Sequence, residues 1–321
     1  MRKPKRVQRQ GRLEQMGTPD LSTRYLGMDL TGPLIASSSP MTRHLDTLLE
    51  LEAAGASAVV LPSLFEEDAR AAESSALASR VELVKKAKDQ LKIPVIASLN
   101  ATRPGTWQDY AEALVDAGAD ALELNLYAVT ADISIASAEV EMEHLAAVEA
   151  VKIVVDVPLA VKLSSYYSAI SSFAARTVDA GADGLVLFNR FYAADIDLEN
   201  LKLEAALDLS VPADQRLPLR WIGILRAQLP TTSLACTSGV HTGAELTKAI
   251  LVGADVACTA SAVMQRGAGA ITEMLDGTSA WLTRHDFPSV AQARGKMSAN
   301  SSRGSAVYER AQYLDVIKGE W

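Results

Sequence analysis

A short phrase recurs in this sequence and limits the folds that the chain can adopt. Residues 116–126 read DAGADALELNL and residues 179–189 read DAGADGLVLFN, and related phrases occupy 54–63 (AGASAVVLPS) and 252–261 (VGADVACTAS). In each phrase a glycine follows an amphipathic stretch, as at helix ends, where glycine adopts the left-handed conformation at little steric cost. The short apolar run after it is typical of a strand buried on both faces. The phrase therefore predicts a repeated helix–glycine–strand unit.

A second set of apolar runs lies between these units. The runs are PLIASSS (33–39), PVIASLN (94–100), PLAVKLS (158–164) and TSLACTSG (232–239). Together the two sets give eight short strands with helical patterns between them, which indicates parallel strands joined by right-handed crossovers. We therefore predict an α/β protein whose single domain is a (β/α)8 TIM barrel. The alternative is an open doubly wound sheet, but no GxGxxG motif follows the first strand to support it.

Two regions depart from this period. Residues 191–231 separate the sixth and seventh expected strands and are too long for a plain loop, so we predict an insertion that ends in a helix over 216–228. Residues 1–19 begin with MRKPKRVQRQGR, which holds six Lys or Arg residues and no acid, and we expect a disordered basic arm there. Residues 20–321 are then the barrel with a C-terminal helical extension.

Charge and hydropathy exclude several classes of partner. The net charge is −8, so no overall positive field attracts a nucleic acid. No run of 18 apolar residues is present, and we expect no membrane span. Cys236 and Cys258 lie in apolar strand-like runs, which indicates reduced core residues of a cytoplasmic protein and no metal site. His44, His144 and His285 lie near acids in helical or loop patterns, and we expect them on the surface.

Polar or small residues stand at the end of every expected strand. In a TIM barrel the carboxyl ends of the strands form the site, so these residues should converge. Burying a polar group without a partner costs about 1–3 kcal/mol, which favours a bound polar ligand. A serine or asparagine can instead satisfy its own turn, but Lys162 in an apolar strand needs a carboxylate or an anionic ligand. The strand-end residues are Ser37, Ser38, Ser63, Asn100, Asn125, Lys162, Asn189, Ser238, Gly239 and Ser261.

The last two units carry a phosphate signature. In TSGVHTGAEL (237–246) and CTASAV (258–263), small polar residues and glycine lie between a strand end and a helix start. Free N–H groups at helix starts after the seventh and eighth strands of such barrels commonly bind phosphate. A phosphorylated cofactor or substrate is therefore expected.

These motifs together resemble the dihydroorotate dehydrogenase family of FMN-dependent barrels, and more narrowly its dihydroorotate dehydrogenase-like group. The resemblance covers about residues 20–300 and rests on segments such as GADALELNLY (118–127), GADGLVLFNRF (181–191), TSGVHTG (237–243) and GADVACTASAV (253–263). It implies an oxidoreductase of pyrimidine biosynthesis that takes a small-molecule substrate, dihydroorotate by default. It also implies a cytoplasmic homodimer.

The resemblance implies roles for the strand-end residues as well. Ala36 and Ser37 would lie against the isoalloxazine ring, and Asn100 and Asn125 would hydrogen-bond the flavin or the substrate. Lys162 would lie by the N1–C2 edge of the ring, where a fixed cation stabilises negative charge on the reduced flavin. The other implied contacts are Asn189 with the substrate, and Ser238, Gly239, Ala260 and Ser261 with the FMN phosphate.

The segment after Asn125 departs from the family pattern. Members read N-x-S-C-P-N or N-x-S-S-P-N there, and the Cys or Ser takes a proton from the substrate, whereas this chain reads NLYAVT (125–130). Ala128 stands at the base position and cannot accept a proton, and the lysine that some members carry on the second strand is missing near Pro62. A positioned base is typically worth about 10²–10⁴ in rate. Tyr127 either acts as an acid in the reduction of an activated double bond or packs over the flavin.

The function predicted from the sequence is an FMN-dependent oxidoreductase acting on the CH–CH bond of dihydroorotate or a related small, carbonyl-rich substrate. Ala128 favours one alternative, a non-catalytic or electron-carrying barrel that binds flavin without the usual base. Another alternative is a flavin-free barrel in which Lys162 forms a Schiff base with a carbonyl substrate.

Overall fold

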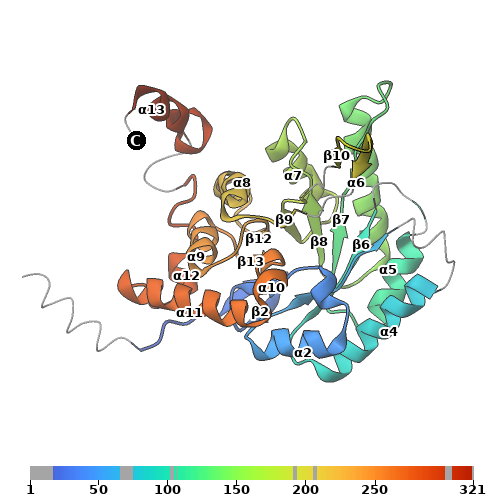
Figure 1. Cartoon of the computed structure of the whole chain (residues 1–321), viewed down its shortest axis with the longest axis horizontal. Coiled ribbons are helices and arrows are strands. Elements are labelled where there is room, and N and C mark those ends of the chain that lie inside the picture. The colour runs from blue at the N-terminus through green and yellow to red at the C-terminus, as the bar shows by residue number, and fades with distance from the viewer. Residues whose placement is uncertain are drawn as a thin grey trace, which may run out of the picture.

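Eight parallel strands close into a barrel in the computed structural model of the chain (Figure 1). Around the barrel they are β3 (Leu34–Ala36), β4 (Val59–Val60), β6 (Val95–Asn100), β7 (Ala121–Asn125), β8 (Leu159–Leu163), β9 (Gly184–Leu187), β12 (Ser233–Cys236) and β13 (Val256–Thr259). β13 pairs with β3 and closes the ring. Each strand lies inside one of the predicted apolar runs, so the predicted (β/α)8 fold is confirmed.

The structure describes most of the chain, and the predicted basic arm lies largely outside the described part, since residues 1–16 are not included. No helix within the described ranges is long and apolar enough to cross a membrane. The described residues are 17–65, 75–101, 105, 107–190, 194–204, 208–300 and 306–319.

Helices follow the strands and cover the outside of the barrel (Figure 1). One apolar core lies between strands and helices, and a second fills the barrel interior around Ile96, Ala160 and Val256. A hairpin of β1 (Thr23–Tyr25) and β2 (Met28–Leu30) contributes Tyr25 to the inner core. The covering helices are α2 (Leu45–Ala53), α4 (Ser75–Gln90), α5 (Trp107–Asp116), α6 (Ser137–Val154), α7 (Ile170–Asp179), α8 (Arg216–Gln228), α9 (Gly243–Val252), α10 (Ser261–Arg266) and α11 (Gly269–Arg284).

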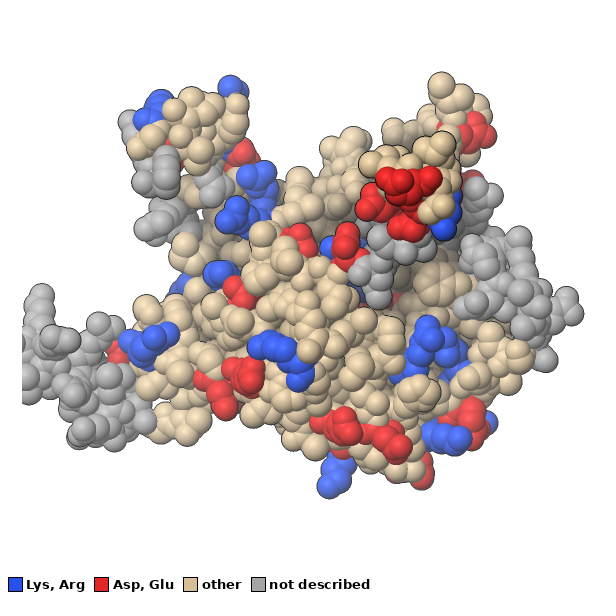
Figure 2. All heavy atoms as spheres, viewed as in Figure 1, with Lys and Arg blue, Asp and Glu red and all other residues tan. Residues whose placement is uncertain are grey.

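The predicted insertion between the sixth and seventh strands is a hairpin followed by a helix. β10 (Asp195–Asp197) pairs antiparallel with β11 (Lys202–Glu204), and a short helix, η2 (Pro212–Gln215), leads into α8. α8 spans Arg216–Gln228, so the helix predicted over 216–228 is confirmed. Figure 2 shows acidic side chains gathered on the hairpin, at the upper right of the view.

The chain ends in two short helical segments, η3 (Val307–Ala311) and α13 (Gln312–Lys318). Figure 1 shows α13 standing apart from the barrel, beyond α8. The Tyr308 hydroxyl donates a hydrogen bond to the Met297 carbonyl, and the Tyr308 ring packs over Gly223 of α8. The extension is therefore attached to the barrel through Tyr308.

The cysteines and histidines test the predictions made for core and surface. Cys236 and Cys258 are free and buried, as predicted. His44 and His285 are exposed, but the prediction that His144 lies on the surface is wrong. His144 lies on the inner face of α6, its Nδ1 is 2.8 Å from the Tyr167 hydroxyl, and burial lowers the pKa of its ring to about 4. Nearby acids in the sequence therefore do not reveal which face of α6 carries it.

The repeated glycines allow a basic side chain to cross the end of each helix. Gly181 and Gly253 have φ values of +109° and +119°, in the left-handed region that glycine adopts most easily. A Cβ atom would lie 2.7 Å from the Cγ of Lys152 at Gly181 and 2.5 Å from the Cγ of Arg226 at Gly253. A larger residue at either position would therefore displace the basic side chain.

In three of the four phrases an aspartate two residues after the glycine joins a helix to a neighbouring strand. Asp120 accepts hydrogen bonds from Lys88 Nζ at 2.7 Å and from the first N–H of β6 at 2.7 Å. Asp183 accepts from Lys152 Nζ at 2.7 Å and from the first N–H of β8 at 2.8 Å. The Gly-Ala-Asp phrase thus makes the same contact at successive units, at the amino ends of the strands.

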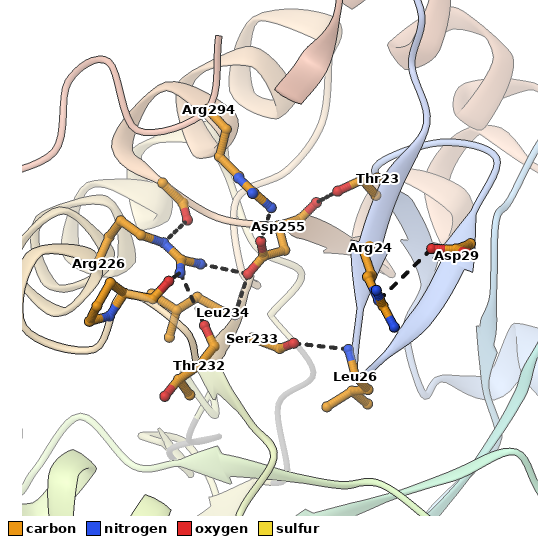
Figure 3. Close-up of polar contacts among 12 residues, drawn as sticks. Thr23, Arg24, Leu26, Asp29, Arg226, Thr232, Ser233, Leu234, Asp255 and Arg294 are labelled. Carbon is orange, nitrogen blue, oxygen red and sulfur yellow. Dashed lines mark hydrogen bonds and ion pairs between the residues drawn. The ribbon is translucent and has the colours of Figure 1, made fainter. Parts of the chain in front are cut away.

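Asp255 makes the most enclosed contact of this kind (Figure 3). Its carboxylate lies 2.5 Å from Arg226 Nη2 on α8 and accepts a hydrogen bond from the Leu234 N–H on β12 at 2.8 Å. Arg294, which follows α12 (Val290–Ala293), pairs with its other oxygen. Thr23 of β1 donates to the Asp255 carbonyl at 2.9 Å. One residue therefore connects two helices, a strand and the β1–β2 hairpin.

We expect Asp255→Asn to lower the free energy of unfolding by about 3–5 kcal/mol, because it leaves two arginines beside a buried position without their carboxylate. Asp183→Asn is the matched control: its side chain is 43% exposed, against 6% for Asp255, so its loss should be about 1 kcal/mol. Denaturant unfolding of the two variants measures both values. Equal losses would contradict the assignment of Asp255 as the main connection.

Candidate ligand-binding site

A cavity of about 450 Å³ opens at the carboxyl ends of the barrel strands. All of the strand-end residues singled out in the sequence line it, and so do two further predicted contacts. Its described lining includes the cations Arg43, Lys162 and Arg190 and contains no Asp, Glu or His. The predicted residues that line the cavity are Ser37, Ser38, Ser63, Asn100, Asn125, Tyr127, Lys162, Asn189, Ser238, Gly239, Ala260 and Ser261.

Ala36 lies apart from this group. Side chains along a strand alternate between its two faces, so Ser37 points into the cavity while Ala36 points the other way. Ala36 is buried in the core between strands and helices. The side chain that β3 offers to a ligand is therefore that of Ser37 rather than Ala36.

Asn100, Asn125 and Lys162 form one layer across three neighbouring strands. Asn100 lies opposite Asn125, and Asn125 lies opposite Lys162, in the registers of β6, β7 and β8. Nδ2 of Asn100 and Oδ1 of Asn125 are buried and have no hydrogen-bond partner within the described residues. Buried polar atoms are normally satisfied, so this layer suits a ligand that offers both an acceptor and a donor.

Glu123 lies one layer below these residues, on the same face of β7 as Asn125. Its side chain is 3% exposed, and Oε1 lies 3.5 Å from Nζ of Lys162. The sequence prediction did not include Glu123, although a lone acid in an apolar strand is the same signal that singled out Lys162. The carboxylate that Lys162 needs is thus supplied from within the barrel.

The protein itself uses part of the hydrogen-bonding capacity of the Asn189 side chain. Its Nδ2 donates to the carbonyls of Leu126 and Lys162, each at 3.2 Å, and so links the ends of β7, β8 and β9. This leaves the side-chain oxygen as the atom that Asn189 can offer to a ligand.

The loops after β12 and β13 meet at another part of the same cavity. Ser238 and Gly239 both have φ of +72°. A Cβ on Gly239 would lie 2.6 Å from the backbone nitrogen of Gln215 and 2.9 Å from the carbonyl oxygen of Val211. The backbone of the insertion therefore packs directly against Gly239 and holds the loop in place.

The insertion also brings residues to the cavity that no sequence motif indicates. The Ser210 N–H donates to Oγ of Ser261 at 3.0 Å, and Ser210 lines the cavity. Arg190 donates to the Asp208 carbonyl and lies 4.0 Å from the Asp214 carboxylate. These positions depend on the path of the insertion, which the hydrophobic pattern does not specify.

Ala128 faces a different space from its neighbour in the sequence. Tyr127 lines the main cavity, whereas Ala128 lines a separate cavity of about 140 Å³ beside His144 and Glu143 of α6. The position where the family carries its base is therefore directed away from the main cavity in this chain.

Two adjacent substitutions test the conformation of the β12 loop. Gly239→Ala should lower the free energy of unfolding by about 2 kcal/mol or more, because it combines a left-handed conformation with a backbone clash. Ser238→Gly should raise it by about 1 kcal/mol, because Ser238 already adopts a left-handed conformation at a cost. Chemical denaturation compares both variants with the wild type. A stable Gly239→Ala protein would show that the insertion does not pack as described.

Several known proteins are similar to the chain, although no family model matches it. The catalytic subunit of dihydroorotate dehydrogenase B (NAD(+)) from Methanosarcina mazei is 29% identical over 215 residues, which are 65% of this chain and 67% of that protein. The subunit of the same name from Pyrococcus abyssi is 25% identical over 297 residues, 86% of this chain and 98% of that protein. That from Methanosarcina acetivorans is 35% identical over 117 residues, 36% of this chain and 37% of that protein. With the closed parallel barrel, these matches show that the chain is similar to proteins of the dihydroorotate dehydrogenase family.

Proposed function

We propose that the chain is an FMN-dependent oxidoreductase that acts on a CH–CH bond of dihydroorotate or a related small, carbonyl-rich substrate. The observation that carries the proposal is the polar layer of the cavity, in which Asn100 and Asn125 have buried atoms without hydrogen-bond partners within the described residues and Lys162 supplies a cation. The pyrimidine edge of a flavin has carbonyl acceptors and an N–H donor, which match the free atoms of this layer. When bound, FMN supplies hydride transfer.

The chain's own residues would bind and orient the ring. Asn100 offers a donor and Asn125 an acceptor, and both are held in register by the strands that carry them. Lys162 offers a fixed cation, which favours negative charge at the edge of the ring beside it. Of Ala36 and Ser37, both predicted to lie against the ring, Ser37 is the one that lines the cavity.

The other end of the cavity suits the phosphate group. Ser238, Gly239, Ala260 and Ser261 line it, on the loops after the seventh and eighth strands of the barrel. Oγ of Ser261 accepts a hydrogen bond from the N–H of Ser210, so its own hydrogen is left to donate. Donors of this kind fit the acceptor oxygens of a phosphate.

Proton transfer to or from the substrate needs a different residue from that of the family. No Asp, Glu or His belongs to the described lining of the cavity, and Ala128 faces the smaller cavity. Tyr127 and Cys258 are the neutral titratable side chains of the described lining, and burial raises the pKa of the Cys258 thiol, which leaves Tyr127 as the proposed acid. We therefore infer that the enzyme reduces an activated double bond, with Tyr127 giving the proton.

Similarity to the family alone supports three further parts of the proposal: a place in pyrimidine biosynthesis, a cytoplasmic location and a homodimer. The mass of the native protein in solution, measured by light scattering, tests the last of these directly.

A non-catalytic or electron-carrying flavoprotein is the second candidate. Ala128 lines the smaller cavity, which favours this second candidate, because the main cavity then lacks the group that removes a proton from dihydroorotate. This candidate keeps FMN and the same binding residues but has no CH–CH substrate.

The absorption spectrum of the purified protein, before and after anaerobic addition of dihydroorotate, separates these candidates. We expect the purified protein to contain bound flavin. Dihydroorotate should bleach it about 10²–10⁴-fold more slowly than in an enzyme with a positioned base. If no CH–CH donor reduces the bound flavin and no activated alkene oxidises the reduced flavin, the result favours the electron carrier. Absence of flavin would contradict the cofactor proposal.

Tyr127→Phe tests the proposed acid. We expect it to lower turnover in the reductive direction by about 10²-fold or more while FMN content stays unchanged, because it removes the proton donor and keeps the ring. Tyr166→Phe is the control, since Tyr166 is exposed and does not line the cavity. Full activity of Tyr127→Phe would leave Tyr127 only a packing role.

A further inference from the structure

Glu123 is a carboxylate enclosed in the barrel interior, directly below the polar layer of the cavity. Its Oε1 is buried and has no hydrogen-bond partner within the described residues. A buried carboxylate is strongly unfavourable unless it is paired, so the ion pair with Lys162 has to compensate for it. Removing either partner would change the charge felt by the other.

The other titratable groups around Glu123 carry no charge near neutral pH. Tyr25 and Cys258 also point into the barrel interior. Burial, with the Glu123 carboxylate among the further causes, raises the pKa of the Cys258 thiol and of the Tyr25 hydroxyl. The other residues of this inner cluster are apolar, and Ser98, which lies opposite Glu123 on β6, is buried and uncharged. Glu123 and Lys162 therefore form a pair with no net charge beneath the cavity.

Lys162 contacts both this pair and the cavity. The 3.5 Å between its Nζ and Oε1 of Glu123 is longer than the roughly 2.7–2.9 Å of a charge-assisted hydrogen bond. Lys162 also lines the cavity, and an ammonium group has three donors to share. One cation thus lies between a carboxylate below and a ligand above.

We propose that Glu123 is a positioning residue that acts through Lys162 and limits the positive charge that this lysine presents to a bound flavin. The inference rests on the proposed function, because it takes the ligand to be FMN. With Glu123 ionised, the pair has no net charge, so Lys162 exerts little net positive charge on the ring. Without that carboxylate, the full charge of Lys162 acts on the ring.

Glu123→Gln tests the proposal, because it keeps the shape of the side chain and removes its charge. We expect the FMN-loaded variant to favour reduced over oxidised flavin at least tenfold more than the wild type. For a two-electron couple this is a rise of about 30 mV in reduction potential. Equilibration with reference dyes during anaerobic reduction measures the potential and needs neither substrate nor turnover.

Two controls separate this role from a structural one. Glu245 is also a buried carboxylate paired with a lysine, Lys248 at 3.2 Å, but it lies on α9 outside the barrel interior. Glu245→Gln should change the flavin ratio less than about threefold. In a Lys162→Met background, Glu123→Gln should also change the ratio less than about threefold, because the residue through which it acts is gone.

The outcomes distinguish the inference from the proposed function. An unchanged or lower potential in FMN-loaded Glu123→Gln overturns the inference and leaves the proposed function standing. A wild-type protein that binds no FMN overturns both. If Glu123→Gln does not fold, Glu123→Leu replaces the carboxylate with an apolar side chain of similar size. It should give the same rise in potential, and a failure to do so overturns the inference equally.

Discussion

The ion pair between Asp255 and Arg226 is the most enclosed of the contacts that attach a helix to the amino ends of the barrel strands. It joins α8 to β12 and β13, the last two strands of the barrel, and Arg294 and the β1–β2 hairpin attach to the same residue. Asp120 and Asp183 make similar contacts, with fewer partners, at the earlier strands β6 and β8. In three of its four copies the recurring phrase is therefore structural: its aspartate accepts a hydrogen bond from an N–H at the amino end of β6, β8 or β12 and pairs with a basic side chain of a helix.

These contacts lie at the amino ends of the strands, and the cavity lies at the carboxyl ends. Because stability is supplied at one end, the other end can keep polar atoms without partners, as at Asn100 and Asn125. Active sites of barrels of this kind generally lie at the carboxyl end, and that arrangement lets site residues vary without loss of the fold. The change at Ala128 is an example, since its side chain packs in a space of its own and leaves the strands undisturbed.

The sequence predicts the strands, the helix over 216–228 and most of the cavity lining, because strand ends can be read from apolar runs and the barrel brings them together. It predicts less where contacts depend on register or on the path of a loop. Glu123 meets Lys162 only because β7 and β8 pair in one register, and Arg190 is held by Asp208 and Asp214 only because the insertion folds back. The prediction for His144 is wrong because the acids beside it in the sequence suggest a solvent-exposed face, whereas its position on α6 places it on the buried face.

The charges of the cavity bear on the chemistry that it can support. Its described lining has cations but no carboxylate, and the acids paired with two of those cations, Glu123 with Lys162 and Asp214 with Arg190, do not line it. Such a site stabilises negative charge on a ligand but cannot readily remove a proton from one. The family pattern pairs flavin with a base that accepts a proton during oxidation. In this chain the balance of groups is what supports the proposed phenol donor, and with it the proposed reduction of a substrate whose carbonyl groups already draw electrons from its double bond.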